Sequence, residues 1–157
     1  MNAADRVVVG RDAVNTLRRA LARDHVLLEV RGEGGEPDWR PVSGMEPFDW
    51  DAPLPLAGAK RFFFPPRETL LRWRRGAVEE AGAENERFAL FGLRACDLTA
   101  IAYQDQFFAT DPWYVSRRGR GLLVGFNCLA ACPGGFCRDV DAGPFARVGF
   151  DLNVTAL

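Results

Sequence analysis

The sequence has few of the residues that most often mark a catalytic site. Its 157 residues include one histidine, His25, and a single lysine, Lys60, among twenty basic residues. Residues 32–35 are rich in glycine, but they lack the spacing and the following helix of a phosphate-binding loop. Ser43 and Ser116 lie outside any nucleophile-elbow motif. His25 falls between a predicted helix and a predicted strand, and we interpret it as a structural residue.

Long hydrophobic runs and a strong net charge are also absent. The longest apolar stretches, such as residues 121–126, have the length of a strand and fall short of the roughly 20 residues of a spanning helix. The apolar residues 7–9 are too few for a signal peptide. The net charge of −1 gives no electrostatic reason to bind nucleic acid or anionic lipid. We therefore expect a cytoplasmic protein with neither nucleic acid nor membrane as a partner.

The length and the order of the predicted elements indicate one α/β domain over residues 1–157. Apolar residues make up 48% of the chain and charged residues 26%, as in ordinary globular proteins. Strand-like segments are residues 26–30, 39–42, 61–64, 88–93, 122–126 and a last apolar stretch at 148–157. Helix-like segments are residues 11–24, 68–75 and 97–108. Their alternation predicts a mixed or largely parallel sheet with flanking helices.

Two of the predicted helices carry specific expectations. In residues 11–24, Val14 and Leu17 belong to the apolar face, and Arg18 belongs to the opposite, polar face. In the helix predicted at 97–108, Asp97 is expected to be the N-cap.

Two segments are predicted to be loops. Residues 32–37 have the composition of a hairpin loop, and residues 44–58 are expected to be irregular.

Residues 60–75 form the one strongly basic stretch. They contain six positive charges against a single negative one, Glu68. We interpret this stretch as a solvated helix face, with a docking patch for an acidic partner as the alternative. Further on, Trp113 and Tyr114 are expected to cap the core.

Cysteines are the most informative residues of the chain. There are four of them, Cys96, Cys128, Cys132 and Cys137, and three lie within ten residues. A disulfide framework is not expected in a cytoplasmic protein, where thiols are kept reduced. Such a cluster is more typical of metal binding or redox chemistry.

The predicted strands would bring the cysteines together. Cys96 follows the strand 88–93 and directly precedes a helix, and Cys128 follows the strand 122–126. Loops that leave the carboxyl ends of parallel strands gather at one sheet edge. We therefore expect a cysteine-rich loop at that edge, near Cys96, with the helix N-terminus stabilising the Cys96 thiolate.

The spacing alone leaves three interpretations open. Four thiolates suit an iron–sulfur cluster or a structural zinc ion. Cys96 could instead be a buried core thiol beside cysteines that merely line a loop. A fourth interpretation, in which Cys96 is a catalytic nucleophile, ranks last because no base lies near it in the sequence.

Seven motifs in order carry a family resemblance. They are KRFFFPPRETLL at 60–71, FGLRACDLTAI at 91–101, DPWY at 111–114, GFNC at 125–128, FC at 136–137, GP at 143–144 and GFDL at 149–152. Over about residues 60–157 the chain resembles the N-terminal domain of the beta subunits of cytoplasmic nickel–iron sulfhydrogenases. It is similar as well to the related A subunit of anaerobic sulfite reductase.

The resemblance implies that this chain transfers electrons and does not itself catalyse a reaction on a substrate. In that family the domain precedes a ferredoxin-like portion with two four-iron clusters, and the subunit passes electrons between a flavin subunit and the catalytic subunit. That portion is absent here, and the sequence ends on an apolar residue, so we expect the N-terminal part of a longer subunit. The alternative is a non-catalytic assembly or docking module with a structural zinc ion or no metal.

We expect one four-iron cluster on the four cysteines, with three further residues beside it: Arg94, Asp97 and Asn127. One departure from the family pattern concerns the ligand set. The family commonly has Cys-Phe-Cys before the Gly-Pro, whereas here Gly135 replaces the first of these cysteines and Cys132 lies three residues earlier. A flexible Pro-Gly-Gly loop would let Cys132 reach the same place.

Overall fold

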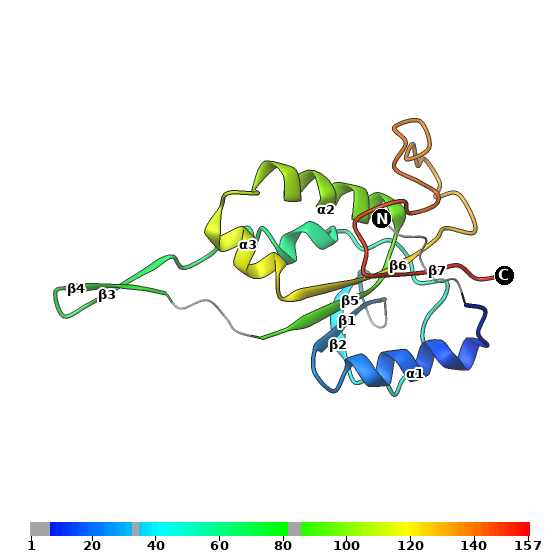
Figure 1. Cartoon of the computed structure of the whole chain (residues 1–157), viewed down its shortest axis with the longest axis horizontal. Helices are drawn as coiled ribbons and strands as arrows, with labels where there is room; N and C mark the ends of the chain where they lie inside the picture. The colour runs from blue at the N-terminus through cyan, green and yellow to red at the C-terminus, as the bar shows by residue number, and fades with distance from the viewer. Residues whose placement is uncertain (1–6, 33–34, 82–85) are drawn as a thin grey trace.

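The fold is a twisted five-stranded sheet between two layers of helix (Figure 1). The computed structural model describes residues 7–32, 35–81 and 86–157. The helices are α1 (Arg11–Leu21), η1 (Ala59–Phe62, a 3₁₀ helix), α2 (Ala95–Phe107) and α3 (Pro112–Arg118). The strands are β1 (Val26–Arg31), β2 (Asp38–Val42), β3 (Leu71–Arg74), β4 (Ala77–Glu80), β5 (Phe88–Leu93), β6 (Gly121–Phe126) and β7 (Leu152–Val154).

The order of strands in the sheet is β2-β1-β5-β6-β7. β1, β5, β6 and β7 run parallel to one another, and β2 pairs with β1 in the antiparallel sense. The central strand β5 is almost wholly buried, which is typical of a parallel strand covered on both faces. The predicted α/β fold with a mixed, largely parallel sheet is confirmed.

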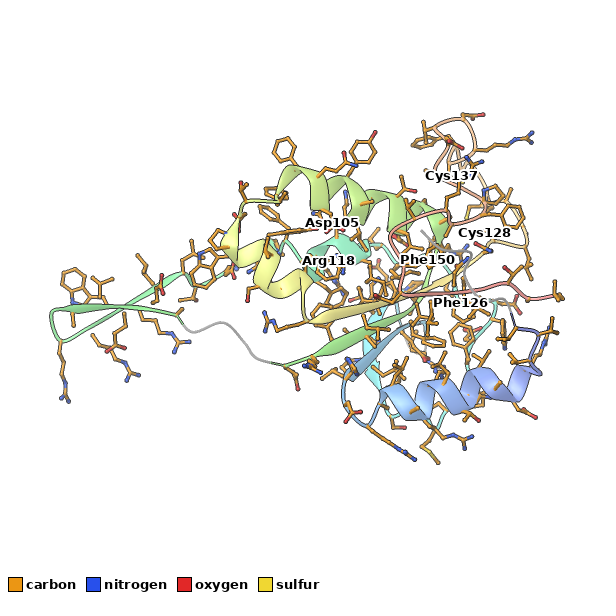
Figure 2. All side chains as sticks on the ribbon, viewed as in Figure 1. Asp105, Arg118, Phe126, Cys128, Cys137 and Phe150 are labelled. Carbon is orange, nitrogen blue, oxygen red and sulfur yellow. The ribbon has the colours of Figure 1, made fainter. Side chains whose placement is uncertain are left out.

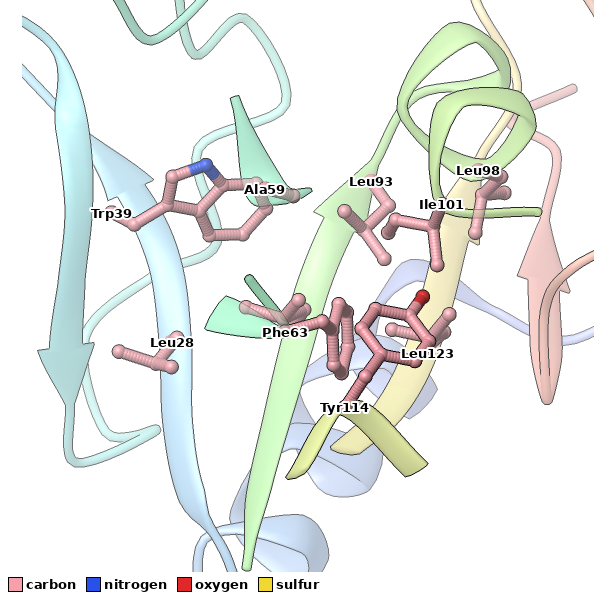
Figure 3. Close-up of a cluster of buried hydrophobic side chains, with 10 residues drawn as sticks. Leu28, Trp39, Ala59, Phe63, Leu93, Leu98, Ile101, Tyr114 and Leu123 are labelled. Atoms are coloured by element: carbon pink, nitrogen blue, oxygen red, sulfur yellow. The ribbon is translucent and has the colours of Figure 1, made fainter. Parts of the chain in front are cut away.

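Each face of the sheet has its own hydrophobic core. α1 covers one face, where Val14 packs with Leu27 and Phe91. η1, α2 and α3 cover the other face, where Phe63, Ile101 and Tyr114 belong to the buried cluster drawn in Figure 3. The expectation that Tyr114 belongs to the core is confirmed, since only 1% of it is exposed. Trp113, by contrast, is half-buried.

Residues 59–81 differ from the prediction. Residues 61–64 form no strand, because η1 turns the chain so that Phe63 becomes fully buried. Residues 68–75 form no helix, because Arg75 and Gly76 have positive φ values of 48° and 83°. Two such residues in succession suit the turn of a tight hairpin, here between β3 and β4. This hairpin extends away from the sheet (Figure 1), so the basic stretch is no helix face.

The helices also show three differences from the prediction. Arg18 does not lie on a solvated face of α1: it is fully buried and pairs with Glu29 of β1. α2 begins at Ala95 with Arg94 as the N-cap, so Asp97 lies at its third position and not at the cap. α3 was not predicted, although Asp111 caps it through the backbone N–H of Tyr114 and Pro112 starts it.

The remaining predicted elements are confirmed with small shifts at their ends. The first helix ends at Leu21 rather than at residue 24, and the last apolar segment contains only the short strand β7. Residues 44–58 contain no regular helix or strand. Of the predicted loop at 32–37, residues 33 and 34 lie outside the described residues. No helix within the described ranges combines the length and the apolar character needed to cross a bilayer.

Candidate functional site

The four cysteines lie around the carboxyl ends of the parallel strands β5 and β6. Cys96 is the second residue of α2, directly after β5, and Cys128 is the second residue after β6. Cys132 and Cys137 belong to the loop that follows Cys128; Figure 2 labels Cys128 and Cys137 there. All four are free thiols of intermediate burial. The predicted cysteine-rich loop at this sheet edge is therefore present.

The Cys96 thiol is held in its neutral form. Burial raises its pKa to about 11, and the negative charges of Asp97 and of ionised Cys128 and Cys137 contribute to the rise. A hydrogen bond from the Asp97 backbone acts in the opposite direction but is the smallest of these effects. The expected stabilisation of the thiolate by the helix N-terminus is thus outweighed. This raised pKa gives no support to Cys96 as a nucleophile.

The charges of the neighbouring thiols also affect the pKa of Cys128. Its pKa is raised, first by burial and then by ionised Cys132 and Cys137, while the positive charge of Arg94 lowers it. The backbone N–H of Cys128 donates to the carbonyl of Pro144 at 3.1 Å. This bond joins the start of the cysteine loop to its return segment.

Cys132 and Gly135 are close neighbours in the loop. The backbone N–H of Gly135 donates to the Cys132 carbonyl at 2.9 Å. A Cβ atom at Gly135 would lie 3.2 Å from the Cβ atom of Cys132. A side chain at position 135 would therefore start beside the one at position 132.

Cys137 and the start of α2 both lie close to Gly143. A Cβ atom at Gly143 would meet the Cys137 Sγ atom at 3.4 Å and the Ala95 Cβ atom at 3.6 Å. The backbone of Gly143 therefore runs between the loop and the residue before Cys96. A Cβ atom at this position would be in ordinary van der Waals contact with both residues.

Arg94 connects the sheet edge to the loop. Its Nη1 atom donates to the Sγ atom of Cys132 at 3.4 Å, and its Nη2 atom donates to the carbonyl of Ala52 at 2.8 Å. Ala52 lies in an irregular segment, and no sequence pattern pointed to this contact. The positive charge of Arg94 is thus held beside the thiols.

Asp97 and Asn127 have structural contacts at the same edge. The Asp97 carboxylate accepts the backbone N–H of Arg94 at 3.3 Å, and burial raises its pKa. The Asn127 Oδ1 atom accepts from the Ala146 backbone at 2.8 Å, and its Nδ2 atom donates to Thr155 Oγ1 at 2.6 Å. Asn127 therefore ties the far end of the cysteine loop to the segment after β7.

The donor set fits a group that is bound by thiolates. Four free, half-buried thiols lie near enough to one another for their charges to interact. Within residues 7–32, 35–81 and 86–157, however, no three His, Cys, Asp or Glu side chains already form a metal site. The thiols would have to move closer together on binding, as is usual when metal binding is coupled to ordering of its ligands.

Comparison with known proteins finds a similar hydrogenase subunit. The chain is 29% identical over 115 residues to sulfhydrogenase 2 subunit beta of Pyrococcus furiosus, a match that covers 71% of this chain. It spans only 33% of that relative. No family model and no solved structure matches the chain. The match confirms the resemblance found in the sequence: the chain is similar to a sulfhydrogenase beta subunit over most of its length.

Proposed function

We propose that this chain is an electron-transfer domain of a multi-subunit oxidoreductase, and that Cys96, Cys128, Cys132 and Cys137 hold one four-iron cluster. The observation that carries the proposal is the gathering of four free thiols at the carboxyl edge of the sheet. The homologue supports it, since that protein is named as a subunit of a sulfhydrogenase.

The surroundings of the thiols suit a redox group. A cluster would carry electrons, and the residues of this chain would bind it and set its potential. Hydrogen bonds and positive charges near the sulfur atoms favour the reduced, more negative form. Arg94 is positioned for this role by its bonds to Cys132 and Ala52.

Cys132 is the proposed replacement for the cysteine that the family has at position 135. Its Cβ atom lies 3.2 Å from where a Cβ atom at Gly135 would be. A cysteine at either position would therefore approach the proposed cluster from nearly the same point.

The partners follow from this role. The chain spans one third of its homologue, so we propose that it is the N-terminal part of a longer, cytoplasmic subunit. That subunit would pass electrons between a flavin-containing subunit and a catalytic subunit of a hydrogenase or of a sulfur or sulfite reductase. The chemistry on the substrate would take place in the catalytic subunit.

Iron, acid-labile sulfide and zinc, counted per chain on protein purified without oxygen, test the proposal. About four iron and four sulfide are expected from a four-iron cluster. One zinc per chain without iron would contradict it and identify a structural zinc site. A brown colour and a signal in the electron paramagnetic resonance spectrum after reduction would accompany the expected result.

A rescue experiment tests the ligand set. Cys132→Ser should lose most of the bound iron, and the double variant Cys132→Ser with Gly135→Cys should regain it, because the two positions adjoin. Full iron content in Cys132→Ser would show that Cys132 is not a ligand. The matched control is Gly135→Ser in the wild-type background, which adds a side chain at position 135 without a thiol.

The alternative function is that of an assembly or docking module with zinc or no metal. One observation favours it: the β3–β4 hairpin extends from the domain with apolar side chains exposed to solvent. Trp73 is 77% exposed and Leu71 is 60% exposed. Exposed apolar groups on a projecting hairpin are typical of a surface that a partner covers.

A further inference from the structure

The β3–β4 hairpin has one apolar and one charged face. Directly opposite residues of an antiparallel pair lie on the same face, and side chains alternate between the two faces along each strand. Trp73 is paired with Val78. Leu71 is paired with Glu80 two residues further from the turn, so this pair lies on the same face, the apolar face. The charged face carries the other residues of the two strands: Arg72, Arg74, Ala77 and Glu79.

The described parts of the domain leave the apolar face uncovered. Leu71, Trp73 and Val78 are each at least 59% exposed. β3 and β4 form a sheet of their own, separate from the five-stranded sheet, and every residue of both strands is exposed. A two-stranded hairpin alone is at best marginally stable in water, and it gains stability when another surface packs on its apolar face. The apolar face therefore suits an interface.

Two opposite charges flank the centre of the apolar face at equal spacing. Arg75, at the turn, lies two residues beyond Trp73, and Glu80 lies two residues beyond Val78 in the opposite direction. At about 3.3 Å per residue, each charge is roughly 7 Å from the central pair. Both residues are exposed, and neither forms an ion pair with another described residue. The apolar face is thus positive at one end and negative at the other.

Such a face is complementary to a second copy of itself. A twofold axis through the centre of the face, perpendicular to the long direction of the hairpin, packs Trp73 and Val78 against their own copies. The axis also reverses the second hairpin, so that Arg75 of each copy meets Glu80 of the other. Self-complementary surfaces of this kind form closed, isologous dimers. Because the hairpin extends away from the sheet (Figure 1), the two domains lie at opposite ends of the packed hairpins.

We propose that two copies of this chain form a dimer through the apolar faces of their β3–β4 hairpins. Trp73 is the anchor of the contact, since tryptophan is prominent among the residues that dominate binding energies. With three apolar residues from each copy, the contact belongs to the small, transient interfaces below about 1,200 Å², so we expect a dissociation constant on the order of 10 μM. No cysteine takes part, and the dimer is therefore independent of the proposed cluster.

Sedimentation equilibrium of the whole chain, with a reductant that prevents disulfide-linked dimers, tests the proposal. The wild-type chain should dimerise reversibly with the affinity given above. Trp73→Ser should weaken the dimer about a hundredfold, because each dimer loses two central aromatic side chains. Arg75→Glu and Glu80→Arg should each weaken it about tenfold, because like charges then face each other at two places.

A mixture of the two charge variants tests the arrangement of the two copies. In a mixed dimer of Arg75→Glu with Glu80→Arg, each of the two contacts again joins a positive and a negative charge. The equimolar mixture should therefore associate about as tightly as the wild type, although each variant alone does not. Arg74→Glu is the matched control: it makes the same change of charge one residue away, on the charged face, and should dimerise as the wild type does.

Three results would overturn the proposal. They are a wild-type chain that stays monomeric well above the expected dissociation constant, a dimer that Trp73→Ser leaves unchanged, and a mixture of the charge variants that associates no better than either variant alone. The substituted side chains are exposed, so these variants should fold as the wild type does. Iron counted on the same samples keeps the two proposals apart: a monomer that contains iron contradicts only the dimer, and a dimer without iron contradicts only the cluster.

Discussion

Arg94 and Cys132 are joined across 38 residues of sequence by a hydrogen bond of 3.4 Å from the Nη1 atom to the Sγ atom. Arg94 is the N-cap of α2, and Cys132 lies in the loop after β6. The bond therefore connects the two segments that carry the cysteines. It places a permanent positive charge beside a thiol, which predicts a measurable effect on any redox group bound there.

Arg94→Leu should make the reduction potential of the bound cluster more negative, by tens of millivolts. The variant removes a positive charge and a donor that both stabilise the reduced state. A redox titration followed by electron paramagnetic resonance measures the change. Arg120→Leu is the control, because Arg120 bonds to the Ser116 carbonyl, away from the cysteines. An unchanged or more positive potential in Arg94→Leu would contradict the role given to this residue.

Glu29→Ala should lower the free energy of unfolding by about 3–5 kcal/mol, the usual cost of leaving a buried charge unpaired. Arg18 and Glu29 have side-chain exposures of 0% and 1%, and two hydrogen bonds connect them. The double variant Arg18→Met with Glu29→Leu should recover only part of the loss, because Arg31, which also pairs with Glu29, stays without this partner. Urea denaturation measures the free energy of unfolding of each variant. Arg147→Ala breaks an exposed pair with Asp141 and should cost about 0–1 kcal/mol.

Gly121→Ala should destabilise the fold by about 1–3 kcal/mol through overpacking. A Cβ atom there would lie 2.6 Å from Phe63 Cε1 and 2.9 Å from Phe88 Cε2, and both rings are packed at the core. Gly58→Ala is the matched control, since nothing lies within 4 Å of a Cβ atom at that position. Equal unfolding midpoints for the two variants in urea would refute the packing argument.

As the solution becomes alkaline, Tyr114→Phe should lose less stability than the wild-type protein. The Tyr114 hydroxyl donates to Asp105 at 2.7 Å, and burial, followed by this bond, raises its pKa above the ordinary value. Between that value of about 10 and the folded-state pKa, the folded protein keeps the proton that the unfolded chain releases. Stability therefore falls as the pH rises through this window.

The variant lacks the titrating hydroxyl, so its stability should fall less over the same range. At neutral pH it should be less stable than the wild type by about 1–2 kcal/mol, because Asp105 loses a hydrogen bond. Thermal unfolding from pH 8 to pH 11 compares the two proteins. Parallel curves over the whole range would argue against the raised pKa of Tyr114.

Trp73→Ser in the projecting hairpin should change the free energy of unfolding by no more than about 0.5 kcal/mol, since the residue is 77% exposed. It should also remove most of the acrylamide-quenchable tryptophan fluorescence. Binding of a partner subunit, by contrast, should weaken if the hairpin is a docking surface. A large loss of stability would instead assign Trp73 to the fold of the domain.

The hydrophobic pattern alone predicted the central strands of the sheet. The apolar runs at 88–93 and 122–126 are the buried strands β5 and β6. Because parallel strands end at one edge, the positions of Cys96 and Cys128 after these runs were enough to predict that they lie near each other. Residues 68–75 were mispredicted because a short segment of mixed polarity suits a helix as well as a strand, and the turn at Arg75 and Gly76 decided between them.

The sequence by itself determined the fold class, the central strands and the edge on which the cysteines lie, because these depend on local periodicity and on a general rule of topology. Only the tertiary structure decided the contacts between residues far apart in the chain. Arg18 looks like a solvated helix residue until β1 supplies Glu29 as its buried partner. Trp39 looks like an ordinary strand residue until the fold buries its indole N–H, for which the described residues provide no acceptor. Such pairings depend on where distant segments meet, and no local pattern encodes that.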